Sequence, residues 1–216
     1  MAGPLEVSRY RHVVWDWNGT LLDDVDVARG VVDKMLRRRG LAGLSVERYH
    51  AIFDFPIEDY YVKAGFDFEV DPFPRLADEF HAGYRPRWSE CRLHTEALGV
   101  LEWLAVGEVR QTVLSASHQP ALEEQVEFFG VQDHFAELVG IDDHHGGSKV
   151  AQGQRWLQAA EESAGEVVLV GDTAHDFEVA REMGVDCILV ADGHQPRERL
   201  EECGVPVVDS LAELLR

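Results

Sequence analysis

The sequence contains little positive charge. Only three of its 216 residues are lysines, and lysine and arginine together number 20 against 40 aspartates and glutamates, so the formal net charge is −20. A surface this acidic repels nucleic acid and anionic lipid. We therefore predict neither as a partner. An anionic substrate would need locally concentrated positive charge, from a metal ion or a well-placed lysine.

Cysteine and long apolar runs are also scarce. Cys91, Cys187 and Cys203 are odd in number and follow no zinc spacing, which indicates reduced thiols rather than a disulfide framework. No apolar run is long enough to cross a bilayer, and the first residues lack the apolar core of a secretory signal. These absences predict a cytoplasmic protein. The 45% of hydrophobic residues favours a globular fold.

Apolar patterns alternate between strand and helix, with one interruption. A strand is expected at 11–15, and helices at 24–39, 45–53, from Pro56, and at 74–85. From residue 95 to the C-terminus the alternation is regular, with strands at 109–114, 136–139, 167–170, 187–190 and 205–208. This predicts an α/β fold, a Rossmann-like doubly wound parallel sheet, with a helical insert after the first strand.

Polar residues follow the ends of several predicted strands. Asp16 ends the first strand, Ser115 ends the strand at 109–114, and Asp172 ends the strand at 167–170. Lys149 opens a helix, and Asp176 lies four residues after Asp172. In a doubly wound sheet, ligands bind outside the carboxyl ends of the strands, so these side chains are expected at one edge. Two carboxylates and a backbone carbonyl suit Mg²⁺, and a hydroxyl, backbone amides and an ammonium suit a phosphoryl group.

Four segments resemble the motifs of the haloacid dehalogenase superfamily, in its phosphoglycolate phosphatase-like branch with a small helical cap. They are D-W-N-G-T at 16–20, T-V-L-S at 112–115, Lys149, and G-D-T-A-H-D at 171–176. The resemblance covers nearly the whole chain. It implies a core domain of residues 1–22 and 90–216, a helical cap of residues 23–89, and hydrolysis of a small phosphorylated metabolite.

The resemblance also implies roles for individual residues. Asp16 would be the nucleophile that forms an aspartyl-phosphate. Asp16 and Asp172, with the main-chain oxygen of Asn18, would hold Mg²⁺ as the cofactor. Asp176 would anchor the metal through water or steady Lys149.

Phosphate binding is implied for a second group of residues in the same motifs. Ser115 and Lys149 would hold the phosphoryl oxygens, together with the backbone amide of Ala116. Lys149 would also restrain the nucleophile, and Thr20 would support the loop that carries it. Neutralising charge matters here because an anionic nucleophile must approach an anionic phosphate.

Asn18 departs from the family pattern. Phosphatases of this family usually carry an aspartate two residues after the nucleophile, as general acid and then base. An amide cannot exchange a proton at neutral pH, and general acid–base catalysis contributes a factor of about 10²–10⁴. Slow turnover or a long-lived phospho-enzyme is therefore expected. The alternative is a catalytically weak protein that binds a phosphorylated ligand or partner.

Other interpretations fit the residues less well. A dehalogenase needs no metal ligands at Asp172 and Asp176, and a phosphonatase needs a Schiff-base lysine in the cap. A receiver domain has no large insert after its first strand. Asp142, Asp143, His144 and His145 are interpreted as a solvated loop rather than a second metal site. Four aromatic residues of the insert, together with His81, Tyr84 and Arg85, are expected to form its core, with a substrate pocket as the alternative. The four are Phe53, Phe55, Tyr60 and Tyr61.

Overall fold

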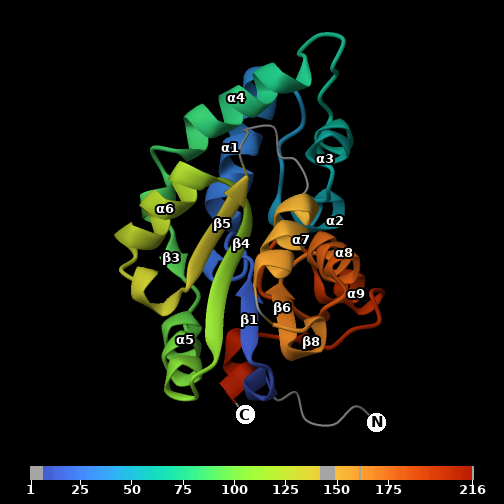
Figure 1. Ribbon diagram of the computed structural model, residues 1–216. Helices are drawn as coiled ribbons and strands as arrows, with labels where there is room; N and C mark the ends of the chain where they lie inside the picture. Colours follow the sequence, from blue (N-terminus) through green and yellow to red (C-terminus); the bar gives the residue numbers. More distant parts are fainter. Residues whose placement is uncertain (1–6, 142–148, 161, 216) are drawn as a thin grey trace.

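The computed structural model describes residues 7–141, 149–160 and 162–215, and its centre is a parallel sheet (Figure 1). The strand order is β5-β4-β1-β6-β7-β8, and neighbouring strands in this sheet run parallel. The strands are β1 His12–Trp15, β4 Arg110–His118, β5 Glu137–Ile141, β6 Val167–Gly171, β7 Asp186–Val190 and β8 Val207–Val208. The predicted fold class, a Rossmann-like doubly wound α/β sheet, is confirmed.

β1 lies at the point where the strand order reverses. From β1 the chain continues to β4 and β5 on one side, and then to β6, β7 and β8 on the other. All four residues of β1 are buried, and alternate side chains belong to different clusters: Val13 and Trp15 to one, Val14 to the other. The crevice at such a switch point is where open α/β sheets bind their ligands. Asp16 follows β1 directly at this crevice.

Two layers of helices cover the sheet. The apolar cluster on one face includes residues of α5 (Ala97–Val106) and α6 (Gln119–Phe128). The cluster on the other face includes residues of α7 (Val150–Ala159), α8 (Ala174–Met183) and α9 (Arg197–Glu201). The 3-10 helix Leu211–Leu215 closes the fold, with Leu211 and Leu214 buried.

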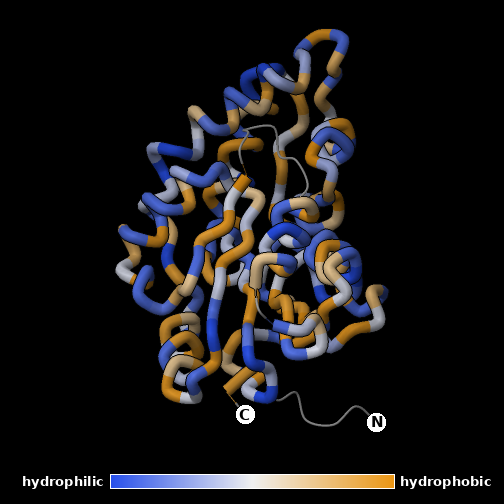
Figure 2. Tube along the Cα trace, in the orientation of Figure 1, coloured by the Kyte–Doolittle hydropathy of each residue, from blue (hydrophilic) through white to orange (hydrophobic). Residues whose placement is uncertain are grey.

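Four helices stand above the carboxyl ends of β1 and β4 (Figure 1). They are α1 Val25–Arg38, α2 Val46–Ile52, α3 Ile57–Ala64 and α4 Phe73–Tyr84. Ser45 caps α2 as expected, with its hydroxyl accepting from the Arg48 amide at 3.2 Å. In Figure 2, hydrophobic and hydrophilic residues alternate along these helices, as they do where one helix face is buried.

A short antiparallel ribbon connects the helical insert to the rest of the chain. β2 (Leu22–Asp23) pairs with β3 (Arg92–Leu93). No strand was expected between the one at 11–15 and residue 109, so neither β2 nor β3 was predicted. Two-residue strands leave no periodic pattern in the sequence. This ribbon forms because the segment that enters the insert lies beside the segment that leaves it.

The loop after α2 packs the insert onto the core. Phe53 stacks on His194 at a centroid distance of 4.7 Å, and its carbonyl oxygen accepts hydrogen bonds from Gln195 and Arg199. Phe55 stacks on His175 at 4.6 Å. Aromatic faces and buried hydrogen bonds therefore fix the insert over the crevice. Among the described residues, no helix is long and apolar enough to span a membrane.

Candidate active site

Asp16 is carried by a tight loop between β1 and β2. The amides of Leu21 and Leu22 donate to the Trp17 carbonyl, and the Gly19 amide donates to Leu22. Gly19 has a φ of +81°, and a Cβ there would overlap the Asp172 carboxyl and the His194 ring. The loop therefore requires glycine at this position for two reasons, its backbone conformation and its close approach to Asp172.

Lys149 connects the predicted nucleophile to the start of α8. Its ammonium group donates to Asp16 Oδ1 and to the Leu114 carbonyl at 3.0 Å, and lies 2.7 Å from Asp176 Oδ1. Lys149 and Asp176 are each 2% exposed. Although burial acts to lower the pKa of Lys149, the charges of Asp16 and Asp176 outweigh it and raise that pKa. We call these three residues the Lys149 cluster.

Asp176 is held by the start of α8. Its Oδ2 accepts from the Thr173 amide at 3.0 Å and the Thr173 hydroxyl at 2.7 Å, which completes a capping box. Its other oxygen faces Lys149. Burial acts to raise the pKa of Asp176, but the Lys149 charge reverses the shift and lowers it. The same carboxylate thus caps a helix and pairs with the lysine.

Asp172 lies beneath the Asp16 loop and is fully buried. Its Oδ1 accepts from the Thr20 hydroxyl at 2.8 Å, and its Oδ2 accepts from the His194 amide at 2.7 Å. Burial raises its pKa, and the charge of Asp176 adds to that rise. Thr20 therefore supports the loop, as the sequence predicts, through Asp172 and a longer contact to Asp16 at 3.4 Å.

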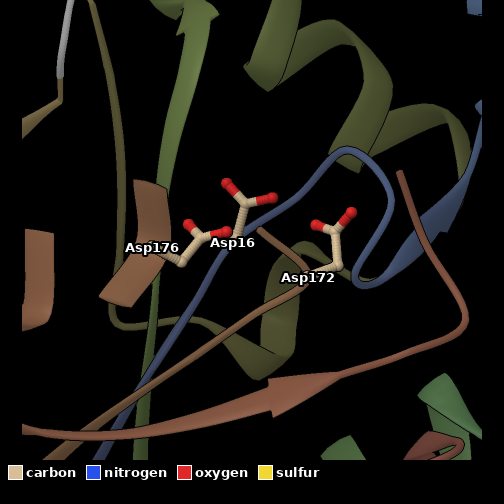
Figure 3. A group of neighbouring side chains, drawn as sticks. All are labelled: Asp16, Asp172 and Asp176. Carbon is tan, nitrogen blue, oxygen red and sulfur yellow. The ribbon is translucent and has the colours of Figure 1, made fainter. Parts of the chain in front are cut away.

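Three carboxylates share one space at this edge of the sheet (Figure 3). Asp16, Asp172 and Asp176 each offer one oxygen, and these oxygens lie within 4.8 Å of one another. Burial raises the pKa of Asp16 to about 8 despite Lys149, and the negative charges of Asp176 and Asp172 contribute. With a single ammonium against three carboxylates, the site carries more negative charge than its own residues neutralise.

Ser115 and Ala116 line the same cavity as Asp16 and Lys149. The strand was expected to end at Ser115, but β4 continues to His118, with a register irregularity between Leu114 and His118. The Ser115 hydroxyl accepts from the Ser117 amide at 3.0 Å. All the predicted phosphate-binding residues except Thr20 therefore face one cavity, with Thr20 buried behind the loop.

Asn18 belongs to a second set of contacts, which the sequence analysis did not predict. Its amide nitrogen donates to Asp24 Oδ2 at 2.9 Å and to the Tyr84 hydroxyl at 3.0 Å, and its oxygen accepts from the Ser117 hydroxyl at 2.8 Å. His194 Nε2 lies 3.2 Å from Asp24 Oδ1. We call Asn18, Asp24, Tyr84 and His194 the Asn18 network.

His194 carries a positive charge within this network. Burial acts to lower its pKa, but the charge and hydrogen bond of Asp24 raise that pKa to about 9. Burial acts to raise the pKa of Asp24, but the charge of His194 and the hydrogen bonds of His194, Tyr84 and Asn18 outweigh it and lower that pKa. The other ring nitrogen of His194 is 2.6 Å from the Tyr49 hydroxyl. His194 follows β7, so the strand-end argument extended by one strand would have found it.

The cavity above Asp16 has a volume of about 600 Å³. Seven residues of the insert were predicted to form its core, with a substrate pocket as the alternative. All seven line this cavity: Phe53, Phe55, Tyr60, Tyr61, His81, Tyr84 and Arg85. Phe53, Tyr60, Tyr61 and Tyr84 also belong to the buried core. The acidic and histidine residues at 142–145 lie outside the described residues. The three cysteines are free thiols.

The family model described as "Haloacid dehalogenase-like hydrolase" matches residues 13–190. This chain belongs to that family. The resemblance inferred from the motifs is therefore confirmed, and with it the assignment to a family of hydrolases.

Several proteins are similar over most of the chain. The tyrosine-protein kinase PtkA of Mycobacterium tuberculosis is 25% identical over 207 residues, covering 94% of this chain and 69% of PtkA. The PtkA structure superposes with a TM-score of 0.79 at 22% identity, covering 95% of this chain and 96% of that one.

Structures with still lower identity share the same fold. The haloacid dehalogenase-like hydrolase family protein SP0104 of Streptococcus pneumoniae has a TM-score of 0.84 at 15% identity, covering 97% and 98% of the two chains. A predicted phosphatase of Clostridium acetobutylicum has a TM-score of 0.82 at 18% identity, covering 95% and 96%.

Proposed function

We propose that this chain is a magnesium-dependent phosphatase that hydrolyses a phosphate monoester through an aspartyl-phosphate on Asp16. The observation that carries the proposal is the Lys149 cluster beside Asp172. Together they combine a carboxylate at the switch point of the sheet, an ammonium in contact with it, and two further carboxylates, Asp176 of the cluster and Asp172 beside it. We retain the division into a core of residues 1–22 and 90–216 and a cap of residues 23–89 as part of this proposal.

The donor set supports Mg²⁺ as the cofactor. Three carboxylates offer only oxygen, which Mg²⁺ prefers, and their excess negative charge is what a divalent cation neutralises. Asp16 and Asp172, with the Asn18 carbonyl, would hold the ion, and Asp176 would reach it through water. Bound there, the ion would neutralise charge between the phosphate and the nucleophile.

The chain's own residues supply the remaining parts of the reaction. Lys149 holds Asp16 in place and offers its charge to the phosphoryl oxygens, while Ser115 and the Ala116 amide would bind those oxygens. Asp16 attacks phosphorus, the bond to the leaving oxygen breaks, and water then attacks the aspartyl-phosphate to release phosphate. Asn18 can neither protonate the leaving group nor activate that water.

A second candidate function follows from the contacts of Asn18. Its three hydrogen bonds fix the side chain to Asp24, Tyr84 and Ser117, in a position that supports structure rather than proton transfer. A protein that binds a phosphorylated ligand or partner and turns it over weakly would tolerate such an arrangement. Tight ligand binding without phosphate release would favour this function.

The test measures phosphate release from p-nitrophenyl phosphate and a panel of phosphorylated metabolites, with Mg²⁺ or with EDTA. We expect release with Mg²⁺ only, and a loss of at least about 10³-fold in Asp16→Asn. Asp23→Asn, in the exposed position of β2, is the matched control and should retain activity. Metal-independent release, or full activity in Asp16→Asn, would overturn the proposal.

The same assay distinguishes phosphate transfer to water from transfer to a protein side chain. Because the mycobacterial relatives are named tyrosine-protein kinases, one arm contains ATP and a tyrosine-containing peptide. We expect no phosphopeptide. Efficient transfer to the peptide without release of phosphate would replace the phosphatase proposal by a kinase.

A further inference from the structure

The cavity above Asp16 is walled by aromatic rings. Nine phenylalanine, tyrosine and tryptophan residues line it, among them Phe55, Tyr61, Phe73 and Phe80 from the helical insert. Its volume of about 600 Å³ lies within the range of about 300–1,000 Å³ for sites that take a drug-sized ligand. Rings of this kind gain free energy by covering an apolar or aromatic group. Six of the nine are already buried against other residues, whereas Phe55, Phe73 and Phe80 are partly exposed. A leaving group as small and polar as glycolate would leave these three rings uncovered.

The lysine and arginine side chains on the described cavity wall are already paired. Lys149 contacts Asp16 and Asp176, and Arg85 lies 3.7 Å from Glu124, with its side chain 79% exposed. Glu124 adds negative charge to the same wall, and the charges of Asp24 and His194, which also line it, offset each other. The carboxylates of the cavity would therefore repel a second anionic group on the substrate. The lysine and arginine of the described wall are already paired and would not offset that repulsion.

Asn18 supplies an independent argument about the leaving group. Both N–H bonds of its amide are used, toward Asp24 and Tyr84, and an amide has no proton to give at neutral pH. The leaving oxygen must then depart as an anion. A phenol has a pKa of about 10, like the tyrosine side chain. An alcohol ionises about as weakly as water, and so far less readily than a phenol. Only the phenolic oxygen leaves readily without a proton donor.

We propose that the substrates of this site are aryl phosphate monoesters, in which an aromatic ring is bonded directly to the phosphate oxygen. The proposal rests on the proposed phosphatase function and specifies its substrate class. An Asp16 oxygen bonds to phosphorus, the phosphorus–aryl oxygen bond breaks, and the aryl oxide leaves with the electron pair and takes a proton from solvent. Water then attacks phosphorus, so that phosphate is released, its proton passes to solvent, and the Asp16 carboxylate is restored.

Three esters separate the features of the proposed substrate. Phenyl phosphate has an aromatic ring and a phenolic leaving oxygen, benzyl phosphate has the ring but an alcohol oxygen, and cyclohexyl phosphate has neither. With Mg²⁺ we expect kcat/KM for phenyl phosphate to exceed that for each of the others by at least about 10²-fold. Phosphoglycolate should be at least as poor as cyclohexyl phosphate.

Asn18→Asp tests whether the missing proton donor causes this preference. The introduced carboxyl can protonate an alcohol oxygen, so the ratio of phenyl to benzyl phosphate should fall at least about tenfold. Phe80→Ala should raise KM for phenyl phosphate about fivefold or more, whereas Phe128→Ala, on an exposed ring outside the cavity, should not. The control is intact-mass and peptide analysis of the assayed native chain, in which we expect residue 18 to be an amide.

The outcomes separate the two proposals. Equal kcat/KM for phenyl, benzyl and cyclohexyl phosphates would overturn the aryl specificity and leave the phosphatase intact, as would efficient cleavage of phosphoglycolate. An unchanged ratio in Asn18→Asp with normal folding would also overturn it. Release from no ester, in the native chain and in Asn18→Asp alike, would overturn the phosphatase function and the specificity together.

Discussion

Two sets of side chains meet on opposite sides of the Asp16 loop, and they differ in how they are held. The Lys149 cluster is built by core elements: Asp16 follows β1, Lys149 precedes α7, and Asp176 lies in the first turn of α8. The Asn18 network joins the core to the insert, because Asp24 caps α1 and Tyr84 ends α4. The Lys149 cluster, with Asp172 beside it, concentrates negative charge, whereas the Asn18 network pairs the negative charge of Asp24 with the positive charge of His194.

The two sets therefore have different roles: the Lys149 cluster serves the proposed reaction, and the Asn18 network holds the insert on the core. In the Lys149 cluster, burial and like charges raise the pKa of Asp16 to about 8, an arrangement that costs stability and is typical of functional sites. In the Asn18 network, the pKa of Asp24 is lowered and that of His194 is raised to about 9, as expected of a stabilising ion pair. Variants on the two sides should therefore respond differently to metal and to pH.

The largest effect is expected for Lys149→Met. Removing the ammonium leaves Asp16 and Asp176 buried without their partner, which should lower the free energy of unfolding by about 3 kcal/mol in EDTA and abolish turnover. Mg²⁺ should recover part of the stability, since a cation replaces the missing charge. Urea denaturation with and without Mg²⁺ measures this. The exposed Lys63→Met is the control, and an equal loss in both variants would contradict the cluster's role.

Asn18→Asp should have the next largest effect on stability. In the native chain the Asn18 amide nitrogen lies 2.9 Å from Asp24 Oδ2, and in the variant a carboxylate oxygen would take the place of that nitrogen. A hydrogen bond then becomes a repulsion, and the free energy of unfolding should fall by about 2 kcal/mol. In the double variant Asn18→Asp/Asp24→Asn the carboxylate and the amide exchange places. Its loss should be smaller than the sum of the single losses by at least about 1 kcal/mol. Additive losses would show that the two side chains do not interact.

The sequence predicted the Lys149 cluster because topology alone assembles it. Parallel strands bring their carboxyl ends to one edge, which places Asp16 there. Lys149 and Asp176 stand at the start of α7 and α8, the helices that follow β5 and β6 from the same edge. The Asn18 network depends on where the insert docks, which no periodic pattern encodes. Asp24 looks like an ordinary helix cap in the sequence, and its side chain has no capping hydrogen bond because it faces His194 and Tyr84 instead.

His194→Gln should give a pH-dependent loss of stability. The folded pKa of about 9 lies above the usual 6.5, so the stabilisation is fully present below pH 6.5 and disappears as pH rises through 9. At about 1.4 kcal/mol per pKa unit it amounts to at most about 3 kcal/mol, and we expect about 2. Urea denaturation in EDTA at pH 6 and pH 9.5 should show the native chain and the variant converging at the higher pH. A difference that is constant with pH, as expected for His134→Gln, would contradict the ion pair.

The smallest effect is expected for Ser117→Ala, which removes a single neutral hydrogen bond. The Ser117 hydroxyl donates to Asn18 Oδ1 at 2.8 Å, and its loss should lower the free energy of unfolding by about 1 kcal/mol. Ser8→Ala, at an exposed position, is the control and should change it by less than about 0.5 kcal/mol. The Ser117 hydroxyl contacts Asn18, and the variant keeps the Ser117 amide that donates to Ser115. The increase in unfolding temperature caused by Mg²⁺ should therefore be the same in the variant as in the native chain. A smaller increase would mean that the two sides of the loop are coupled, and that holding the Asn18 side chain in place is part of binding the metal.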